Sequence, residues 1–300
     1  MKQYNLGIIM HYVKVKTILS AKNGMKLYRG CSHGCIYCDS RSNCYNMQHK
    51  FEDIEIKENA IELLENALKS KRKKCMIGMG SMTDPYIPLE SDIQNTRKSL
   101  ELIYKYDCGA TLITKSVNVL RDLDILKAIN SKIKCVIQMT LTTADEKLCK
   151  IIEPNVSSTK ERFETLKILN QNNIPTIVWL TPILPFINDT EENLIGILNY
   201  CIKAKVYGII CFSMGVTLRE GNREYFYNRL DKFFPSIKEK YIKEYGNNYI
   251  LNSPNNKYLM NLFYKICEQN HIICDNSKIF EYLNAFESKE IKEEQQLELF

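Results

Sequence analysis

Residues Tyr28–Cys38, YRGCSHGCIYC, hold Cys31, Cys35 and Cys38 in a C-x3-C-x2-C arrangement. Thiolates are soft ligands that suit iron–sulfur clusters or zinc. A cubane cluster normally takes four thiolates, so three closely spaced ones would leave one iron without a protein ligand. An open metal position is what a catalytic centre needs and a purely structural centre does not. The spacing therefore indicates a metal centre that keeps one position open.

Strand-like and helix-like segments alternate outward from this motif. Short apolar runs occur at residues 25–28, 75–79, 110–114, 134–139, 175–180 and 207–212. Amphipathic stretches of helical length lie between them, at residues 59–71, 93–104, 119–129, 159–170 and 190–203. This alternation is typical of βαβ units, so we expect an α/β fold with six units, either a partial TIM-like barrel or an open curved sheet. The cysteine motif directly follows the first predicted strand, and active sites of α/β barrels lie at the carboxyl ends of strands.

The composition argues against several classes of protein. The chain has 300 residues and a formal net charge of +6, and this length allows a single α/β core. No run of about 18 apolar residues is present, as a membrane-spanning helix would require. No long apolar run follows Lys2, as a secretory signal would require, so we expect a cytoplasmic protein. The densest basic run, residues 71–74, is interpreted as a solvated helix end, with a nucleic-acid patch as the alternative.

The twelve cysteines do not predict a disulfide framework, because no secretory signal accompanies them. Those outside the motif form no C-x-x-C pair, and we expect most of them to be small buried groups. Two alternatives to an iron–sulfur centre stay open. The three clustered cysteines would bind zinc if Cys44 or His33 supplied a fourth ligand, or they would cluster by chance.

In this spacing and context, the sequence resembles the radical SAM superfamily. The resemblance implies a [4Fe–4S] cluster held by Cys31, Cys35 and Cys38, whose free iron chelates the amino and carboxylate groups of S-adenosylmethionine (SAM). It further implies that one electron cleaves SAM to methionine and a 5′-deoxyadenosyl radical, which abstracts a hydrogen atom from the substrate. An electron donor such as flavodoxin or ferredoxin would supply the electron.

The similarity covers roughly residues 10–210 and resembles the branch related to spore photoproduct lyase, often labelled DNA repair photolyase-like. This implies a partial (βα)6 TIM-like barrel of the radical SAM type over residues 1–214. The segments that carry the similarity are residues 28–38, 83–90 (TDPYIPLE), 113–116 (ITKS) with 120–122 (LRD), 141–146 (LTTADE) with 152–154 (IEP), and 182–189 (PILPFIND).

The resemblance implies SAM contacts at the ends of the second and third predicted strands. Gly78, Gly80 and Ser81 end the second strand, where glycines allow a ligand to approach the backbone and where radical SAM folds receive the methionine amino group. Asp84 would position this amino group, or it forms an Asx turn before a proline. Lys115 ends the third strand and would hold the SAM carboxylate, or it is a capping or surface lysine.

Further contacts are implied along the rest of the barrel. Thr140 ends the fourth strand and would bond the ribose or the carboxylate, unless it only fills the strand. The planar guanidinium of Arg162 suits a carboxylate, whereas its alternative is a surface ion pair with Glu161 or Glu164. The turn at Pro182 would contact adenine. Tyr37 would stack there too, or pack beside the cluster.

One position departs from the family pattern. Spore photoproduct lyase carries a cysteine just before its T-S-D-P-like segment, where the thiol donates a hydrogen atom to the product radical. The matching position here holds Ser81, and an O–H bond is too strong to replace a thiol S–H in that step. Neither Cys75 nor Cys44 is placed at the site by the sequence, so repair of spore photoproduct itself is not expected.

The chain changes character after residue 214. Residues 215–286 are rich in Tyr, Lys and Asn, and we expect a helical extension that covers one end of the barrel. Residues 287–300 form a charged, flexible tail that ends QLELF. This ending resembles the peptide with which bacterial replication and repair proteins dock on the DNA sliding clamp, through Gln296, Leu297, Leu299 and Phe300. The alternative is a final amphipathic turn that packs on this chain.

Three functions follow from these features. The first is a radical SAM enzyme that acts on nucleic acid, in lyase-like repair or modification of DNA. The second is a radical SAM enzyme that modifies a peptide or a small molecule. The third is a non-catalytic metal-binding module that recruits partners through its tail.

Overall fold

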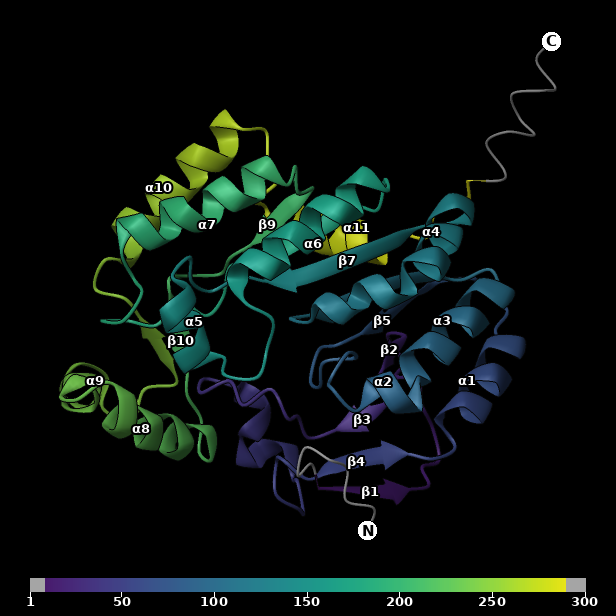
Figure 1. Ribbon diagram of the computed structural model, residues 1–300, viewed down its shortest axis with the longest axis horizontal. Helices are drawn as coiled ribbons and strands as arrows, with labels where there is room; N and C mark the ends of the chain where they lie inside the picture. The colour runs from purple at the N-terminus through teal and green to yellow at the C-terminus, as the bar shows by residue number, and fades with distance from the viewer. Residues whose placement is uncertain (1–8, 290–300) are drawn as a thin grey trace.

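A computed structural model describes residues 9–289, and its central element is a parallel sheet of six strands (Figure 1). The strands pair in the order β2-β5-β6-β7-β8-β9, which is their order along the chain, with β2 and β9 as the outermost strands. This is the partial α/β barrel that the alternating sequence pattern predicts. The strands are β2 (Gly24–Met25), β5 (Met76–Met79), β6 (Gly109–Thr114), β7 (Cys135–Thr140), β8 (Thr176–Trp179) and β9 (Gly208–Ile210).

Helices cover the outside of this sheet (Figure 1). All residues of β7 are buried, as expected for a parallel strand that is covered on both faces. The helices that connect the strands are α1 (Ala60–Lys69), α2 (Glu90–Ile93), α3 (Asn95–Lys105), α4 (Leu123–Lys132), α5 (Glu146–Ile152), α6 (Thr159–Gln171) and α7 (Glu191–Lys203), with short 3-10 helices η1 (Asp39–Arg41), η2 (Asn43–Tyr45) and η3 (Val117–Asp122).

A second sheet of three strands lies beside the barrel. It includes part of the run that was predicted as the first barrel strand, so that prediction was only partly right. The predicted run 25–28 splits between β2 in the barrel and β3 (Tyr28–Arg29), which pairs with β4 (Ile54–Lys57) in the order β1-β4-β3. Strand β1 (Met10–Val13) runs parallel to β4, whereas β3 is antiparallel to it. The cysteine motif therefore leaves from the small sheet and crosses to the barrel.

The chain after residue 214 is mainly helical but includes two strands that the sequence pattern did not predict. These strands form an antiparallel pair. Helix α10 contacts α7, and α11 contacts β9 at an edge of the barrel. The elements are β10 (Gly215–Thr217), α8 (Asn222–Phe233), α9 (Ile237–Tyr245), β11 (Ile250–Asn252), α10 (Asn256–Gln269) and α11 (Asn276–Asn284). The boundaries at residues 214 and 286 stay predictions.

A distinct apolar cluster joins the cysteine motif to this C-terminal region. Cys35, Ile36 and Tyr37 share it with residues of α8, α9 and β11, among them Phe226 and Tyr241. The predicted clamp-binding residues Gln296, Leu297, Leu299 and Phe300 lie outside the described residues. Among residues 9–289, no helix is long and apolar enough to cross a membrane.

Candidate active site

A cavity of about 530 Å³ opens at the carboxyl ends of the barrel strands. All three motif cysteines line it, which brings together thiols that leave the small sheet and side chains that end the barrel strands. The predicted site residues that line this cavity are Cys31, Cys35, Cys38, Tyr37, Gly80, Ser81, Asp84, Lys115, Thr140 and Pro182. Gly78 and Arg162 do not line it, and the SAM-binding roles of all these residues stay predictions.

Close backbone contacts on two sides fix the cysteine loop. Gly30 has φ = +85°, and a Cβ at this position would lie 2.6 Å from the Phe51 carbonyl oxygen, so only glycine fits without strain. The backbone N–H of Cys31 donates to this same carbonyl oxygen over 2.9 Å. On the barrel side, the N–H of Ile36 donates to the Ile152 carbonyl oxygen over 3.0 Å. The loop is therefore attached on one side to the segment before β4 and on the other to the end of α5.

The thiols fit a centre that binds them as thiolates. Burial raises the pKa of Cys31 to about 12 and raises the pKa of Cys35 well above its ordinary value. Both are therefore neutral thiols near pH 7 unless a metal displaces their protons, as metal binding to thiols does. Thiolates are soft ligands, and both an iron–sulfur cluster and zinc would displace these protons on binding.

The spacing of the thiols does not favour a single zinc ion. Zn–S bonds of about 2.3 Å place the sulfurs around one tetrahedral ion about 3.8 Å apart. Within residues 9–289, no three ligand atoms drawn from the motif cysteines, His33 and Cys44 lie within 4.8 Å of one another. Cys44 is exposed, and its sulfur accepts a hydrogen bond from Arg219 Nη1 over 3.2 Å. A cubane binds its thiolates through different irons and so suits the wider spacing.

Asp84 ties together the ends of two barrel strands. Its Oδ1 accepts hydrogen bonds of 2.8 Å from the Tyr86 backbone N–H, as in an Asx turn, and of 2.8 Å from the Thr114 hydroxyl. Its Oδ2 accepts from the Lys115 backbone N–H over 2.7 Å and lies 3.6 Å from His33 Nδ1. The carboxylate thus holds the loop after β5 against the end of β6, which positions the neighbouring cavity residues.

Lys115 places a cation within the cavity. Its Nζ lies 6.0 Å from the centroid of the Tyr37 ring. Burial alone would lower the pKa of Lys115, but Cys35 in its thiolate form and the carboxylate of Glu153 raise it above its ordinary value. The ammonium is therefore retained at neutral pH and is available to an anionic ligand.

Gly80 forms the opposite side of the same region. Its φ is +98°, and a Cβ there would lie 2.0 Å from the carbonyl oxygen of Ile113, the residue two positions before Lys115. Only glycine allows β5 to turn this close to β6. Gly78, by contrast, would meet only Thr111 Cγ2 at 3.8 Å, so its position does not require glycine in the same way.

A buried ion pair lies behind the cavity wall. Arg162 is fully buried, and its Nη2 pairs with Glu153, whose side chain is also inaccessible to solvent. Its Nη1 donates to the Thr140 carbonyl oxygen over 2.7 Å. The Tyr37 hydroxyl donates to the same Glu153 carboxylate. The alternative of a surface pair with Glu161 or Glu164 is therefore wrong, because the guanidinium binds inward.

The similarity segments outside the cysteine motif thus have a structural explanation. Glu153 belongs to the segment IEP and received no role from the sequence, yet it links the cysteine loop to β7 through Tyr37 and Arg162. A second network joins the segments TDPYIPLE and LRD: Glu90 accepts from Arg121 Nη2 over 3.0 Å and from the Tyr28 hydroxyl. The sequence signal that could have predicted these two networks is the presence of a charged residue, Glu153 or Glu90, beside apolar residues in each segment.

Aromatic residues at the cavity are the main feature that the sequence did not reveal. Trp179 and Phe212 line the cavity, and Phe212 is 60% exposed. The rings of Trp179 and Phe280 support it, with centroid distances of 6.3 and 6.3 Å from Phe212. Both cavity residues end apolar strand runs, where sequence periodicity does not distinguish a core aromatic from an exposed one.

The residues that line the cavity agree with the prediction that Ser81 replaces the hydrogen-atom-donating cysteine of spore photoproduct lyase. Ser81 lines the cavity, whereas Cys44 and Cys75 are not among its lining residues. Of the cysteines in the described part of the chain, only those of the motif line this cavity.

Comparison with known proteins identifies the family. The sequence model of the radical SAM superfamily matches residues 25–201. The uncharacterized protein MJ0683 of Methanocaldococcus jannaschii is 35% identical over 176 residues, which are 58% of this chain and 65% of that protein. The uncharacterized protein Rv2578c of Mycobacterium tuberculosis is 24% identical over 254 residues, which are 80% of this chain and 74% of that protein.

Solved structures show the same fold. A spore photoproduct lyase mutant superposes with a TM-score of 0.62 at 15% identity, covering 86% of this chain and 79% of the lyase. The radical SAM methyltransferase TsrM of Kitasatospora setae, with cobalamin and a [4Fe–4S] cluster, gives a TM-score of 0.57 at 11% identity, covering 85% of this chain and 55% of TsrM. The match of the family model and the cysteine cavity lead to one conclusion: this chain belongs to the radical SAM superfamily, whose members use a [4Fe–4S] cluster and S-adenosylmethionine.

Proposed function

We propose that this chain cleaves SAM reductively at a [4Fe–4S] cluster held by Cys31, Cys35 and Cys38, and that it acts on nucleic acid in lyase-like repair or modification. The observation that carries the substrate class is a second cavity of about 330 Å³, which shares Ser40, Tyr45 and Met82 with the first. The two cavities together offer a place for a base and a place for a phosphate.

The first cavity supplies the cofactor site in this proposal. When bound, the cluster and SAM supply a 5′-deoxyadenosyl radical that removes a hydrogen atom from the substrate. Lys115 holds the SAM carboxylate by charge. The turn at Gly80 and Ser81 lets the methionine amino group approach the backbone, and Pro182 offers an apolar contact for adenine. A reductant such as flavodoxin or ferredoxin supplies the electron.

The second cavity supplies the electrostatic part of the argument. Lys26, Arg29 and Lys57 line it, and Glu55 is the one carboxylate among its lining residues in the described part of the chain, so cations outnumber the anion there. Phosphate contacts by such side chains provide sequence-independent affinity for nucleic acids. The exposed ring of Phe212 in the first cavity provides a surface on which a base stacks.

Anaerobic reconstitution tests the catalytic part of the proposal. We expect a brown protein with about four irons per chain that forms 5′-deoxyadenosine from SAM after reduction. A colourless protein with stoichiometric zinc and no SAM cleavage would contradict the proposal and support the non-catalytic recruitment module.

Deuterium transfer into 5′-deoxyadenosine tests the substrate class. The holoenzyme is offered deuterated, lesion-bearing oligonucleotides in one set of reactions and deuterated peptide pools in another. Transfer from an oligonucleotide supports the proposal. Transfer from peptides alone would establish the second function, modification of a peptide or small molecule.

Salt-dependent binding tests the phosphate site. Replacing the exposed Lys26 by alanine is expected to weaken oligonucleotide binding whatever the sequence, and to reduce the slope of log K against log salt by about 0.7 for a single strand. Lys22→Ala is the matched control, because Lys22 is also exposed but does not line the second cavity. Equal slopes for both variants would contradict a phosphate site in the second cavity.

The C-terminal peptide would add a tether to this function. We propose that Gln296, Leu297, Leu299 and Phe300 dock on a DNA sliding clamp, which would bring the enzyme to DNA. The support is the sequence pattern alone. Calorimetry with a peptide of residues 287–300 and the clamp tests it, and no measurable heat of binding would reject the tether while leaving the cavity argument intact.

A further inference from the structure

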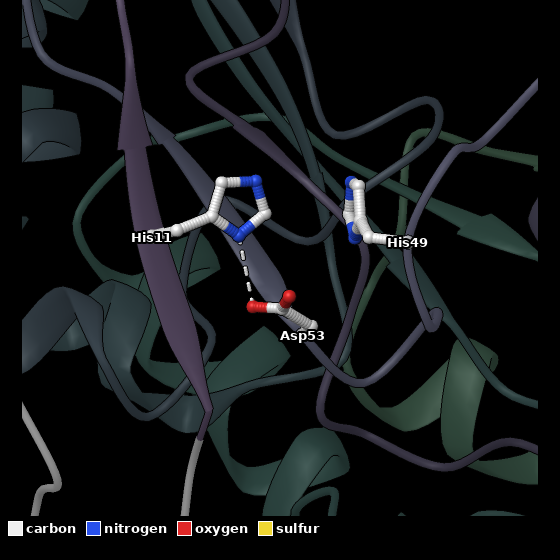
Figure 2. Close-up of side chains that lie close together, drawn as sticks. All are labelled: His11, His49 and Asp53. Carbon is white, nitrogen blue, oxygen red and sulfur yellow. Dashed lines mark hydrogen bonds and ion pairs between the residues drawn. The ribbon is translucent and has the colours of Figure 1, made fainter. Parts of the chain in front are cut away.

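A cluster of two histidines and one aspartate lies at the small sheet (Figure 2). His11 belongs to β1, whereas His49 and Asp53 precede β4. One ligand atom from each side chain lies within 4.8 Å of the others. His11 Nδ1 is 2.9 Å from Asp53 Oδ1, and the two imidazole centroids are 4.8 Å apart. The parallel pairing of β1 with β4 brings His11 next to the loop that carries His49 and Asp53.

The hydrogen bonds of His49 define which ring nitrogen is free to bind a ligand. Nδ1 lies 3.0 Å from the backbone carbonyl oxygen of Lys50. A carbonyl oxygen only accepts, so Nδ1 carries the proton and Nε2 carries the lone pair. Nε2 is buried and has no hydrogen-bond partner among residues 9–289. Metal-binding histidines show this arrangement, in which one nitrogen donates to a carbonyl group and the other faces the ion.

A second carboxylate, that of Glu55, lies near the Nε2 atom of His49. Glu55 pairs with His11 in the register of β1 and β4, and its Oε2 lies 3.6 Å from His49 Nε2. This separation is too long for a hydrogen bond. It is close to the distance of about 3.3 Å between two ligands that each bind one tetrahedral ion at about 2.0–2.1 Å. Two acceptors thus face each other across a gap that suits a cation.

We propose that His11, His49 and Asp53 bind a divalent first-row transition ion, represented by zinc, with Glu55 or water in the remaining position. Imidazole and carboxylate ligands suit such ions. Binding replaces the proton that His11 and Asp53 share and releases it to solvent, so no oxidant or reductant is involved. The site is separate from the iron–sulfur centre, because none of its three residues lines the cysteine cavity.

The position of this site gives it a structural role. The loop that carries His49 and Asp53 also presents the Phe51 carbonyl oxygen, which accepts from the Cys31 N–H. A Cβ on Gly30 would lie 2.8 Å from the Asp53 carbonyl oxygen, so the backbones of the two segments are in close contact. An ion bound here would stabilise the segment of residues 49–53, which accepts the hydrogen bond of Cys31, without contacting the cluster.

Zinc K-edge X-ray absorption tests the proposal on the unmodified holoenzyme. The iron–sulfur protein is loaded with one equivalent of zinc under anaerobic conditions, and iron does not interfere at this edge. We expect a first shell of nitrogen and oxygen only, at about 2.0–2.1 Å. A sulfur shell at about 2.3 Å would mean that zinc binds cysteines instead, and would overturn the proposal.

Substitutions provide a second, independent measurement. His49→Gln and Asp53→Asn are expected to raise the dissociation constant for zinc by at least about 100-fold, with iron content unchanged. His271→Asn is the matched control, because His271 is exposed and lies outside the cluster, and asparagine tolerates its positive φ. Equal zinc affinity in all variants, or no zinc retained by the unmodified holoenzyme, would show that the cluster is held by hydrogen bonds alone.

Discussion

The hydroxyl group of Tyr37 donates a hydrogen bond to the carboxylate of Glu153, 116 residues further along the chain. Glu153 in turn pairs with the buried guanidinium of Arg162, which donates to the Thr140 carbonyl oxygen at the end of β7. The residue before the last motif cysteine is therefore connected to the barrel by a buried charged network. This relationship makes the cysteine loop sensitive to substitutions that do not contact the cofactors.

Replacing Glu153 by glutamine tests this network. The substitution leaves the buried Arg162 without a counter-ion, which is expected to reduce the free energy of unfolding by about 3–5 kcal/mol. Denaturant unfolding of the holoenzyme measures the effect. Glu164→Gln is the control, since the exposed Glu164–Lys167 pair contributes at most about 1 kcal/mol. Similar losses in both variants would contradict the assigned importance of the buried pair.

The same pair predicts a dependence of stability on pH. Burial alone would raise the pKa of Glu153, but the cations of Arg162 and Lys115 hold it below its ordinary value. A lowered pKa in the folded state means that the stabilisation is complete above about pH 4.5 and is lost as the pH falls through the folded-state pKa. The stability difference between wild type and Glu153→Gln should therefore shrink below about pH 4.5. A constant difference across this range would argue against an ionised Glu153.

Substitution of any motif cysteine is expected to abolish the cluster. Cys31→Ala, Cys35→Ala and Cys38→Ala should each lose the bound iron and the reductive cleavage of SAM, because a missing thiolate leaves a second iron without a protein ligand. Iron analysis and 5′-deoxyadenosine formation measure this. Cys44→Ala should retain both properties, since Cys44 is exposed and does not line the cavity. Loss of iron in Cys44→Ala would place a fourth protein ligand on the cluster.

Lys115→Met tests the predicted contact with the SAM carboxylate. Loss of a charged hydrogen-bond donor, worth about 1.5–3 kcal/mol, should raise the dissociation constant for SAM by about 10–150-fold. Equilibrium dialysis of reconstituted protein measures it, with iron content expected to stay unchanged. Lys98→Met serves as the control, because the Lys98 ammonium donates to the Ile93 carbonyl oxygen on the surface. An unchanged affinity for SAM would assign Lys115 a structural role only.

Phe212→Ala tests the proposed stacking surface. Loss of one base–aromatic contact, worth about 1–3 kcal/mol, should weaken binding of a single-stranded oligonucleotide by about 5–150-fold. Because Phe212 lines the same cavity as the motif cysteines, cleavage of SAM without substrate is measured alongside, and an unchanged rate would assign the loss to oligonucleotide binding. Fluorescence anisotropy measures binding, and Phe233→Ala is the control at another exposed phenylalanine. Equal binding by both variants would mean that the substrate does not stack on Phe212.

The six barrel strands and the helices α1, α3, α4, α6 and α7 were predictable because their apolar periodicity is local and regular, whereas the short helices α2 and α5 were not predicted. The first strand was only half right. Residues 25–28 form one apolar run, yet Met25 pairs in the barrel and Tyr28 pairs in the small sheet. Pairing partners are set by distant residues, so the run itself carries no sign of this division. The strands β10 and β11 were missed because each has only three residues, which is too short to show a periodic pattern.

The candidate site was predictable where one residue type has few uses, as with the clustered cysteines. It was less predictable where a side chain has several possible partners. Arg162 was expected either at a ligand or at the surface, and it lies instead in a buried pair with Glu153. The cluster of His11, His49 and Asp53 has no sequence motif, because strand pairing brings His11 to residues about forty positions away.

The attachment of the cysteine loop to residues 152–155 has a consequence for the synthesis of the protein. Ile36 bonds to Ile152, Tyr37 to Glu153, and the Asn155 backbone N–H donates to the His33 carbonyl oxygen over 3.1 Å. A nascent chain that has just exposed Cys38 lacks all of these partners. At about 5–20 residues per second, the ribosome needs roughly 6–23 s more to produce them. The cysteine loop therefore cannot complete these bonds, and so cannot reach its folded position, until residue 155 has been synthesised.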